Sequence, residues 1–261
     1  VKLKASDGKT DIYAVIFRPE GFDPSERYPI LEISSSVRMA RYLPVGSFRN
    51  ASIFGDYSYL FGQAYATAGF IVVMLDGRGV TGREKAFLTH KYGDPGYIND
   101  FSDRIAGMQQ LAERYPYMDI NKVGLIADEN PQHAAAYALL LHSHFYKVAV
   151  LTCVHDSRFL NVELVEMSEG PYHVTGEKKT PWPELCVDTF GGKLLLIQGV
   201  GQNSMPATSY RLVDALQKNN QNFDMLSLPS LSHSITAYTV KRACDYVVLH
   251  LRGEIPPERF K

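Results

Sequence analysis

Short apolar runs alternate with amphipathic segments along most of the chain. The runs have the length and β-branched content of buried strands, and they fall at residues 11–18, 28–33, 70–75, 123–126, 148–153, 193–197 and 223–228. Apolar residues at helical spacing predict helices over residues 57–68, 99–115, 134–141, 204–219 and 237–251. In the second of these, Phe101, Ile105, Met108 and Leu111 form one apolar stripe. Strands that alternate with helices predict a mainly parallel sheet with helices on both faces.

No repeat or break in composition divides the chain, so we expect a single α/β domain over residues 1–261. Residues 159–190 are irregular and are predicted to form a lid excursion. In a parallel sheet the loops that follow the carboxyl ends of the strands gather at one edge, where function is expected. Those loops begin near residues 34, 76, 128, 155, 199 and 230.

Composition narrows the classes of partner and cofactor. The chain has 45% hydrophobic and 21% charged residues, and its net charge of −1 predicts neither nucleic acid nor an anionic membrane as partner. The longest apolar runs are far shorter than a membrane span, so none is predicted. Asp76-Gly77-Arg78-Gly79 lacks the phosphate-loop pattern and is interpreted as a turn. Three scattered cysteines fit no zinc pattern, and no cofactor is predicted.

The segment from Lys122 to His133 has the strand–turn–helix pattern on which an α/β-hydrolase carries its nucleophile. An apolar strand enters the turn and an alanine-rich helix leaves it. A G-x-S-x-G elbow would place a serine in the middle of this turn. Here the same frame reads Ala127-Asp128-Glu129-Asn130-Pro131, which contains no nucleophilic serine.

Several further stretches occur in an order and at spacings that together indicate one family. They are residues 6–13, 17–19, 28–31, 69–79, 115–120, 145–150, 192–197, 228–229 and 232–233. With these the chain resembles the peptidase domain of the prolyl oligopeptidase family, nearest its dipeptidyl peptidase IV branch. The resemblance implies an α/β-hydrolase fold and a serine peptidase ancestry. The β-propeller that precedes this domain in family members is not part of this sequence.

The resemblance places the family's machinery on residues that cannot perform it. The nucleophilic serine falls on Glu129, the catalytic aspartate on Gln202 and the oxyanion-hole tyrosine on Ser35, while the histidine persists as His233. Glu129 is already an anion at neutral pH, so His233 has no proton to remove from it. Gln202 cannot stabilise an imidazolium by charge. Ser35 is too short to replace the tyrosine hydroxyl. We therefore expect no intact catalytic site.

These changes predict a silent peptidase-like domain that acts in binding or assembly. Its partner would be a peptide or an active peptidase homologue, in a homo- or hetero-oligomer. An alternative is an active hydrolase, either of the serine peptidase family or with altered chemistry that uses Glu129 and His233. A peptidase fragment with a deliberately removed serine is a third reading, which the changes at Ser35 and Gln202 disfavour. A metal site is a fourth interpretation. Its ligands would be Asp128, Glu129, His133, His155 and His233, but their spacing matches no ligand pattern.

The sequence leaves the compartment open. Val1 to Lys4 leads into polar residues, so no signal peptide is predicted, and the chain begins without methionine as a mature form or an excised fragment would. The family resemblance implies a periplasmic or secreted location where a signal peptide has been removed.

Overall fold

A computed structural model describes most of the chain. The described residues are 1–35, 43, 56–92, 98–128, 132–152, 184, 186–201, 206–229 and 236–256.

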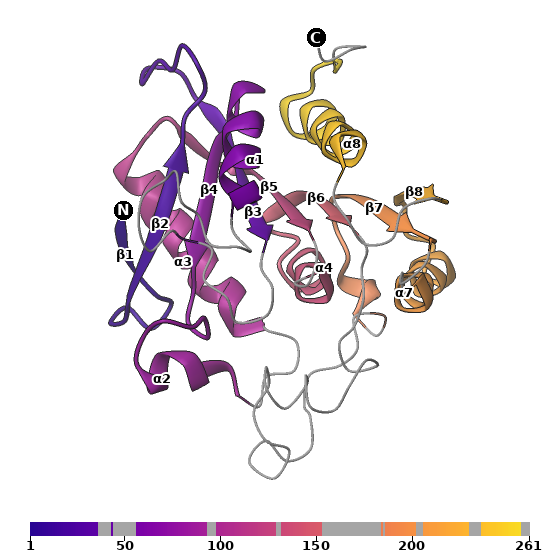
Figure 1. Cartoon of the computed structure of the whole chain (residues 1–261), viewed down its shortest axis with the longest axis horizontal. Coiled ribbons are helices and arrows are strands. Elements are labelled where there is room, and N and C mark those ends of the chain that lie inside the picture. Colours follow the sequence, from indigo (N-terminus) through magenta and orange to yellow (C-terminus); the bar gives the residue numbers. More distant parts are fainter. Residues whose placement is uncertain are drawn as a thin grey trace.

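A mixed, mainly parallel sheet forms the centre of the molecule (Figure 1). Its strand order is β1-β2-β4-β3-β5-β6-β7-β8. The strands are β1 (Lys2–Lys4), β2 (Asp11–Phe17), β3 (Tyr28–Ser35), β4 (Ile71–Asp76), β5 (Met118–Asp128), β6 (Tyr146–Thr152), β7 (Lys193–Gly199) and β8 (Asp224–Leu228). The six strands from β4 to β8 in this order are parallel, whereas β1 and β2 pair antiparallel at one side.

Helices cover both faces of the sheet. In Figure 1, α1 (Asp56–Thr67) and α8 (Ala237–Val247) lie over one face, and α3 (Ile98–Arg114), α4 (Gln132–Leu141) and α7 (Pro206–Lys218) lie over the other. Shorter turns are α2 (Lys85–Leu88), η1 (Thr89–Lys91), η4 (Val187–Thr189) and the π-helical turn η5 (Val248–Arg252). Because both faces are covered, the central strands are mainly apolar. All six residues of β4 are buried. No described helix is both long and apolar enough to cross a membrane.

The predicted α/β architecture is confirmed, with differences at several elements. β1 was not expected, because its sequence is Lys-Leu-Lys, with one apolar residue between two charged ones. β5 begins at Met118 rather than at residue 123. Its first five residues mix apolar and polar side chains, and they precede a register shift opposite Pro29 and Ile30. The segment after Gly79 contains α2 and η1. Gly69 follows α1 in the left-handed conformation (φ 88°) that is typical of a helix-terminating glycine.

Cys244 is a buried thiol, and Cys186 is buried as well. Cys153 and nearly all of the predicted lid, residues 159–190, lie outside the described residues.

The turn after β4 is structural, as predicted. Arg78 donates from Nε and Nη2 to the two carboxylate oxygens of Asp103 on α3, at 2.8 and 2.7 Å, and its backbone N–H adds a third bond at 2.9 Å. Ser6, between β1 and β2, donates two further bonds to the same carboxylate. Burial raises the pKa of Asp103, but the hydrogen bonds from Arg78 and Ser6 outweigh it and lower the pKa below 3.8. One buried carboxylate thus joins three segments that are far apart in the sequence.

We predict that Asp103→Asn lowers the free energy of unfolding at neutral pH. Because the pKa of Asp103 is lower in the folded than in the unfolded state, the carboxylate contributes its full stabilisation above the unfolded pKa and loses it as pH falls through the folded pKa. The stability difference between wild type and variant should therefore be largest near pH 7 and shrink as pH falls below about 4.

Urea unfolding at a series of pH values measures this difference. Asp214→Asn is the matched control, because its pair with Lys218 on α7 is largely exposed and should change stability little at any pH. A difference for Asp103→Asn that stays constant down to pH 3 would contradict the assignment.

Candidate functional site at the carboxyl edge of the sheet

The carboxyl ends of the central strands lie side by side. Ser35 at the end of β3 is in register with Asp128 at the end of β5, and Asp128 is in register with Thr152 at the end of β6. Thr152 is in register with Ile197 of β7, and β7 continues for two more residues to Gly199. The loops that leave β3, β5, β6 and β7 therefore start from one edge of the sheet, as the sequence predicted.

The resemblance assigns catalytic roles to four positions, and each lies at the end of a strand or in the segment that follows one. Glu129 follows the last residue of β5, Gln202 lies three residues after the end of β7, and His233 lies between β8 and α8. These three residues lie outside the described part of the chain, so the convergence of their side chains stays a prediction. Ser35 is the last residue of β3, and its backbone pairs with Asp128, while its side chain lies outside the description.

The strand and the helix on either side of the predicted elbow are confirmed. β5 ends at Asp128 and α4 begins at Gln132. The connection is therefore Glu129-Asn130-Pro131, which contains no hydroxyl or thiol side chain. The helix behind it is anchored firmly, because the residues from Ala135 to Leu140 are all buried. A connection of this length and position is the one that carries the nucleophile in α/β-hydrolases.

A buried polar cluster lies beneath this edge, and sequence reasoning missed it. Arg104 of α3 donates from Nη1 to Oε1 of Glu32 at 2.8 Å and to Oγ of Ser34 at 2.9 Å. The hydroxyl of Tyr146, the first residue of β6, donates to Oε2 of Glu32 at 2.6 Å. Glu32, Ser34, Arg104 and Tyr146 are each at most 2% exposed. The signal in the sequence was a glutamate in the middle of the apolar strand 28–33.

The cluster ties the end of β3 to the helix layer. Glu32 and Ser34 point to the same face because they are two residues apart on a strand, and Arg104 bonds both. Burying two charges is costly unless they are paired and hydrogen-bonded, and here both carboxylate oxygens of Glu32 accept a bond. The position of Ser35, the next residue along β3, is therefore set by a pair of buried charges.

A second buried polar contact supports the end of β7. Gln198 is 1% exposed, and its side-chain amide donates to the carbonyl of Gly199 at 2.6 Å. Ser209 of α7 donates to the amide oxygen of Gln198. This contact holds the two elements that flank the segment containing Gln202.

The described residues do not bring together three or more His, Cys, Asp or Glu side chains in a way that could hold a metal ion. The alternative metal site named above cannot be compared with this result, because its residues lie outside the described part of the chain. This holds for Glu129, His155 and His233, and for the side chains of Asp128 and His133.

We predict that Arg104→Met destabilises the fold by about 3–5 kcal/mol, because it leaves the carboxylate of Glu32 buried without its cation. Glu32→Leu should cost a similar amount for the converse reason. The double variant should lose much less than the sum of the two, since neither charge then remains. A double-mutant cycle by urea unfolding measures the coupling, and losses that simply add would show that the pair is not coupled.

The comparisons with known proteins agree with this architecture. Residues 57–156 match the prolyl oligopeptidase family. Human dipeptidyl peptidase 8 is 24% identical over 259 residues, which include 92% of this chain and 26% of that protein. The mouse dipeptidyl peptidase 8 is 23% identical over the same shares of the two chains. The chain thus spans about a quarter of the length of the curated relatives it matches.

The crystal structure of Porphyromonas gingivalis dipeptidyl peptidase 4 superposes with a TM-score of 0.80 at 22% identity. The superposition covers 96% of this chain and 35% of that one, and it confirms the α/β-hydrolase fold. The resemblance seen in the sequence is therefore confirmed as well: the chain has the α/β-hydrolase fold, is homologous to dipeptidyl peptidase 8 and matches the prolyl oligopeptidase family over residues 57–156.

Proposed function

We propose that this domain is a catalytically silent relative of the dipeptidyl peptidases that acts in binding or assembly. The observation that carries the proposal is the connection between β5 and α4. Its three residues, Glu129, Asn130 and Pro131, supply no group that could attack a peptide carbonyl in the manner of a serine peptidase.

The other family positions support the same conclusion. His233 as a general base would find a carboxylate at position 129, which has no proton to give at neutral pH. Gln202 carries no charge to stabilise an imidazolium, and losing the carboxylate alone costs about 10⁴-fold in rate in serine proteases. Ser35 lacks the reach of a tyrosine hydroxyl, and an oxyanion donor is worth roughly 3–4 kcal/mol. Because these groups act as one unit, the loss of any of them is enough to silence the site.

The elbow sequence also favours stability over catalysis. A nucleophile elbow holds its serine in a strained backbone conformation, which small neighbouring residues tolerate. Asn130-Pro131 is instead the sequence of an ordinary helix start, with an N-cap residue followed by proline. α4 begins one residue later, at Gln132. Acidic residues at positions 128 and 129 then lie near a helix N-terminus, where negative charge is favourable.

A binding role follows from what the chain retains. The helices, the parallel sheet and the buried contacts at the ends of β3 and β7 would keep the carboxyl edge rigid without any chemistry at position 129. A rigid edge with long loops suits a peptide or a surface of an active homologue as its ligand.

The alternative function is a hydrolase of altered chemistry. It is favoured by the presence of a carboxylate and a histidine, Glu129 and His233, at the two family positions where a nucleophile and a base belong. In such an enzyme Glu129 would attack as a carboxylate, and His233 would activate the water that releases the product. The two functions differ in one measurable respect, which is turnover that depends on Glu129.

We predict no labelling by a fluorophosphonate probe and no turnover of proline-containing dipeptide or acyl ester substrates. An active dipeptidyl peptidase treated in parallel is the positive control. If residual turnover is found, Glu129→Gln should leave it unchanged, as should the matched control Glu20→Gln on an exposed turn. Turnover that disappears only in Glu129→Gln would establish the altered hydrolase and overturn the silent assignment.

We also predict a stable complex with a partner. Sedimentation velocity of the protein, alone and mixed with a propeller-bearing dipeptidyl peptidase homologue, measures assembly. Isothermal titration with short proline-containing peptides measures binding in the former cleft. A faster-sedimenting mixture or a saturable heat supports the proposal. Unchanged sedimentation together with no heat would reject the binding and assembly role.

A further inference from the structure

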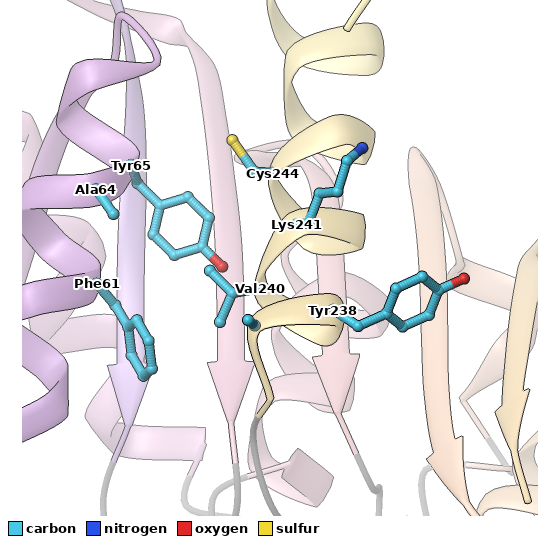
Figure 2. Close-up of a pocket in the computed structure, with 8 residues that line it drawn as sticks. Phe61, Ala64, Tyr65, Tyr238, Val240, Lys241 and Cys244 are labelled. Atoms are coloured by element: carbon cyan, nitrogen blue, oxygen red, sulfur yellow. The ribbon is translucent and has the colours of Figure 1, made fainter. Parts of the chain in front are cut away.

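A groove runs between the helices α1 and α8 on one face of the sheet. It has a volume of about 600 Å³ and is lined by Phe61, Ala64, Tyr65, Ala237, Tyr238, Val240, Lys241 and Cys244. Figure 2 shows Phe61 and Tyr65 on α1 facing Val240 on α8, with the Cys244 sulfur directed towards α1. The Lys241 ammonium points away from the groove in Figure 2 and pairs with Asp245 at 2.6 Å. We call this feature the α1–α8 groove.

The two helices that form the groove rest on different strands. α1 packs against β2, β3 and β4, whereas α8 packs against β6 and β7. The spacing between them is therefore not fixed by a common strand beneath both. A direct bond between the ends of the two helices can set that spacing.

Arg252, the last residue of η5, supplies such a bond at one end of the groove. Its Nη1 donates to the carbonyl oxygen of Ala68 at 2.7 Å, just beyond the end of α1. Carbonyls at the end of a helix lack a partner within the helix, and a cation there also interacts favourably with the helix dipole. The guanidinium is further oriented by Glu254, whose Oε1 accepts from Nε at 2.9 Å and from Nη2 at 2.5 Å.

Gly69 provides the space that the guanidinium occupies. A Cβ built on Gly69 would lie 1.3 Å from Nη1 of Arg252, so any side chain at this position would displace the guanidinium. The glycine also has a φ of 88°, which disfavours other residues. The end of α1 is thus shaped to receive the guanidinium of Arg252.

The alkylation rate of Cys244 can be used to measure opening of the groove. It lines the groove but is only 4% exposed. Burial raises the pKa of its thiol to about 11, which keeps the reactive thiolate scarce near pH 8. Alkylation of Cys244 in the native protein therefore requires a local opening that exposes it, and its rate measures how often this opening occurs.

We propose that Arg252 is a latch that holds the C-terminal unit α8–η5 against the end of α1 and keeps the α1–α8 groove closed over Cys244. Release of the latch lets α8–η5 move away from α1 and exposes the apolar lining of the groove. The latch is a conformational device at the C-terminal end of the fold, and it acts independently of the chemistry at position 129.

Peptide-resolved alkylation with iodoacetamide under native conditions tests the latch. Arg252→Met should raise the rate at Cys244 about tenfold, in line with the loss of one hydrogen bond to a charged group. Cys186, a second buried cysteine, is the internal reference and should keep its rate. Glu254→Gln is the matched control, because it removes the exposed partner and leaves the bond to Ala68 in place. It should change the Cys244 rate by less than about twofold.

Gly69→Ala provides a second test that leaves Arg252 itself unchanged. It should displace the guanidinium by steric contact and raise the Cys244 rate at least as much. The proposal is overturned if Arg252→Met leaves the Cys244 rate within twofold of wild type. It is also overturned if the rates at Cys186 and Cys244 rise together, because that pattern marks a weakening of the whole fold.

Discussion

Helices on both faces of a parallel sheet leave the ends of the strands as the place where function can reside. In this protein α1 and α8 cover one face and α3, α4 and α7 the other (Figure 1). Strands between these layers have to be apolar, because a polar group there loses its water. The loops at the carboxyl edge escape this constraint, and they contain the residues that differ most from the chemistry the fold is known for.

The polar exceptions inside the sheet show how that edge is held. Glu32 and Arg104 are buried charges that satisfy each other and also bond Ser34 and Tyr146. Gln198 and Ser209 form a smaller neutral counterpart at the end of β7. A buried ion pair is weak evidence for stability, since well-packed apolar residues often do as well. Its geometry here, one guanidinium nitrogen bonded to two residues on the same face of β3, favours a role in fixing where that strand ends.

The sequence predicted the fold well because burial imposes a clear pattern. Residues 70–75 are uniformly apolar and residues 193–197 are apolar after Lys193, and both segments proved to be core strands, shifted or extended by one or two residues. β1 and the first residues of β5 were missed because they mix apolar and polar side chains and lack that pattern. The Glu32–Arg104 pair was missed for a different reason: its two members are 72 residues apart, and no local spacing relates them. The family positions at 35, 129, 202 and 233 came from resemblance, and the structure supports only the elements that flank them.

The catalytic silence that we propose for position 129 is compatible with a rigid carboxyl edge, because the two depend on different residues. Catalysis would need strain in the three-residue connection after β5, whereas rigidity needs only the buried contacts below it. A chain relieved of catalysis can therefore relax the connection to an ordinary helix start and still keep β3, β5 and β7 in register. The Arg252 contact lies at the other end of α1 and α8, away from that edge. If the proposed function and the latch both hold, the domain would keep one end fixed for recognition, while the other end controls how tightly its outer helices close.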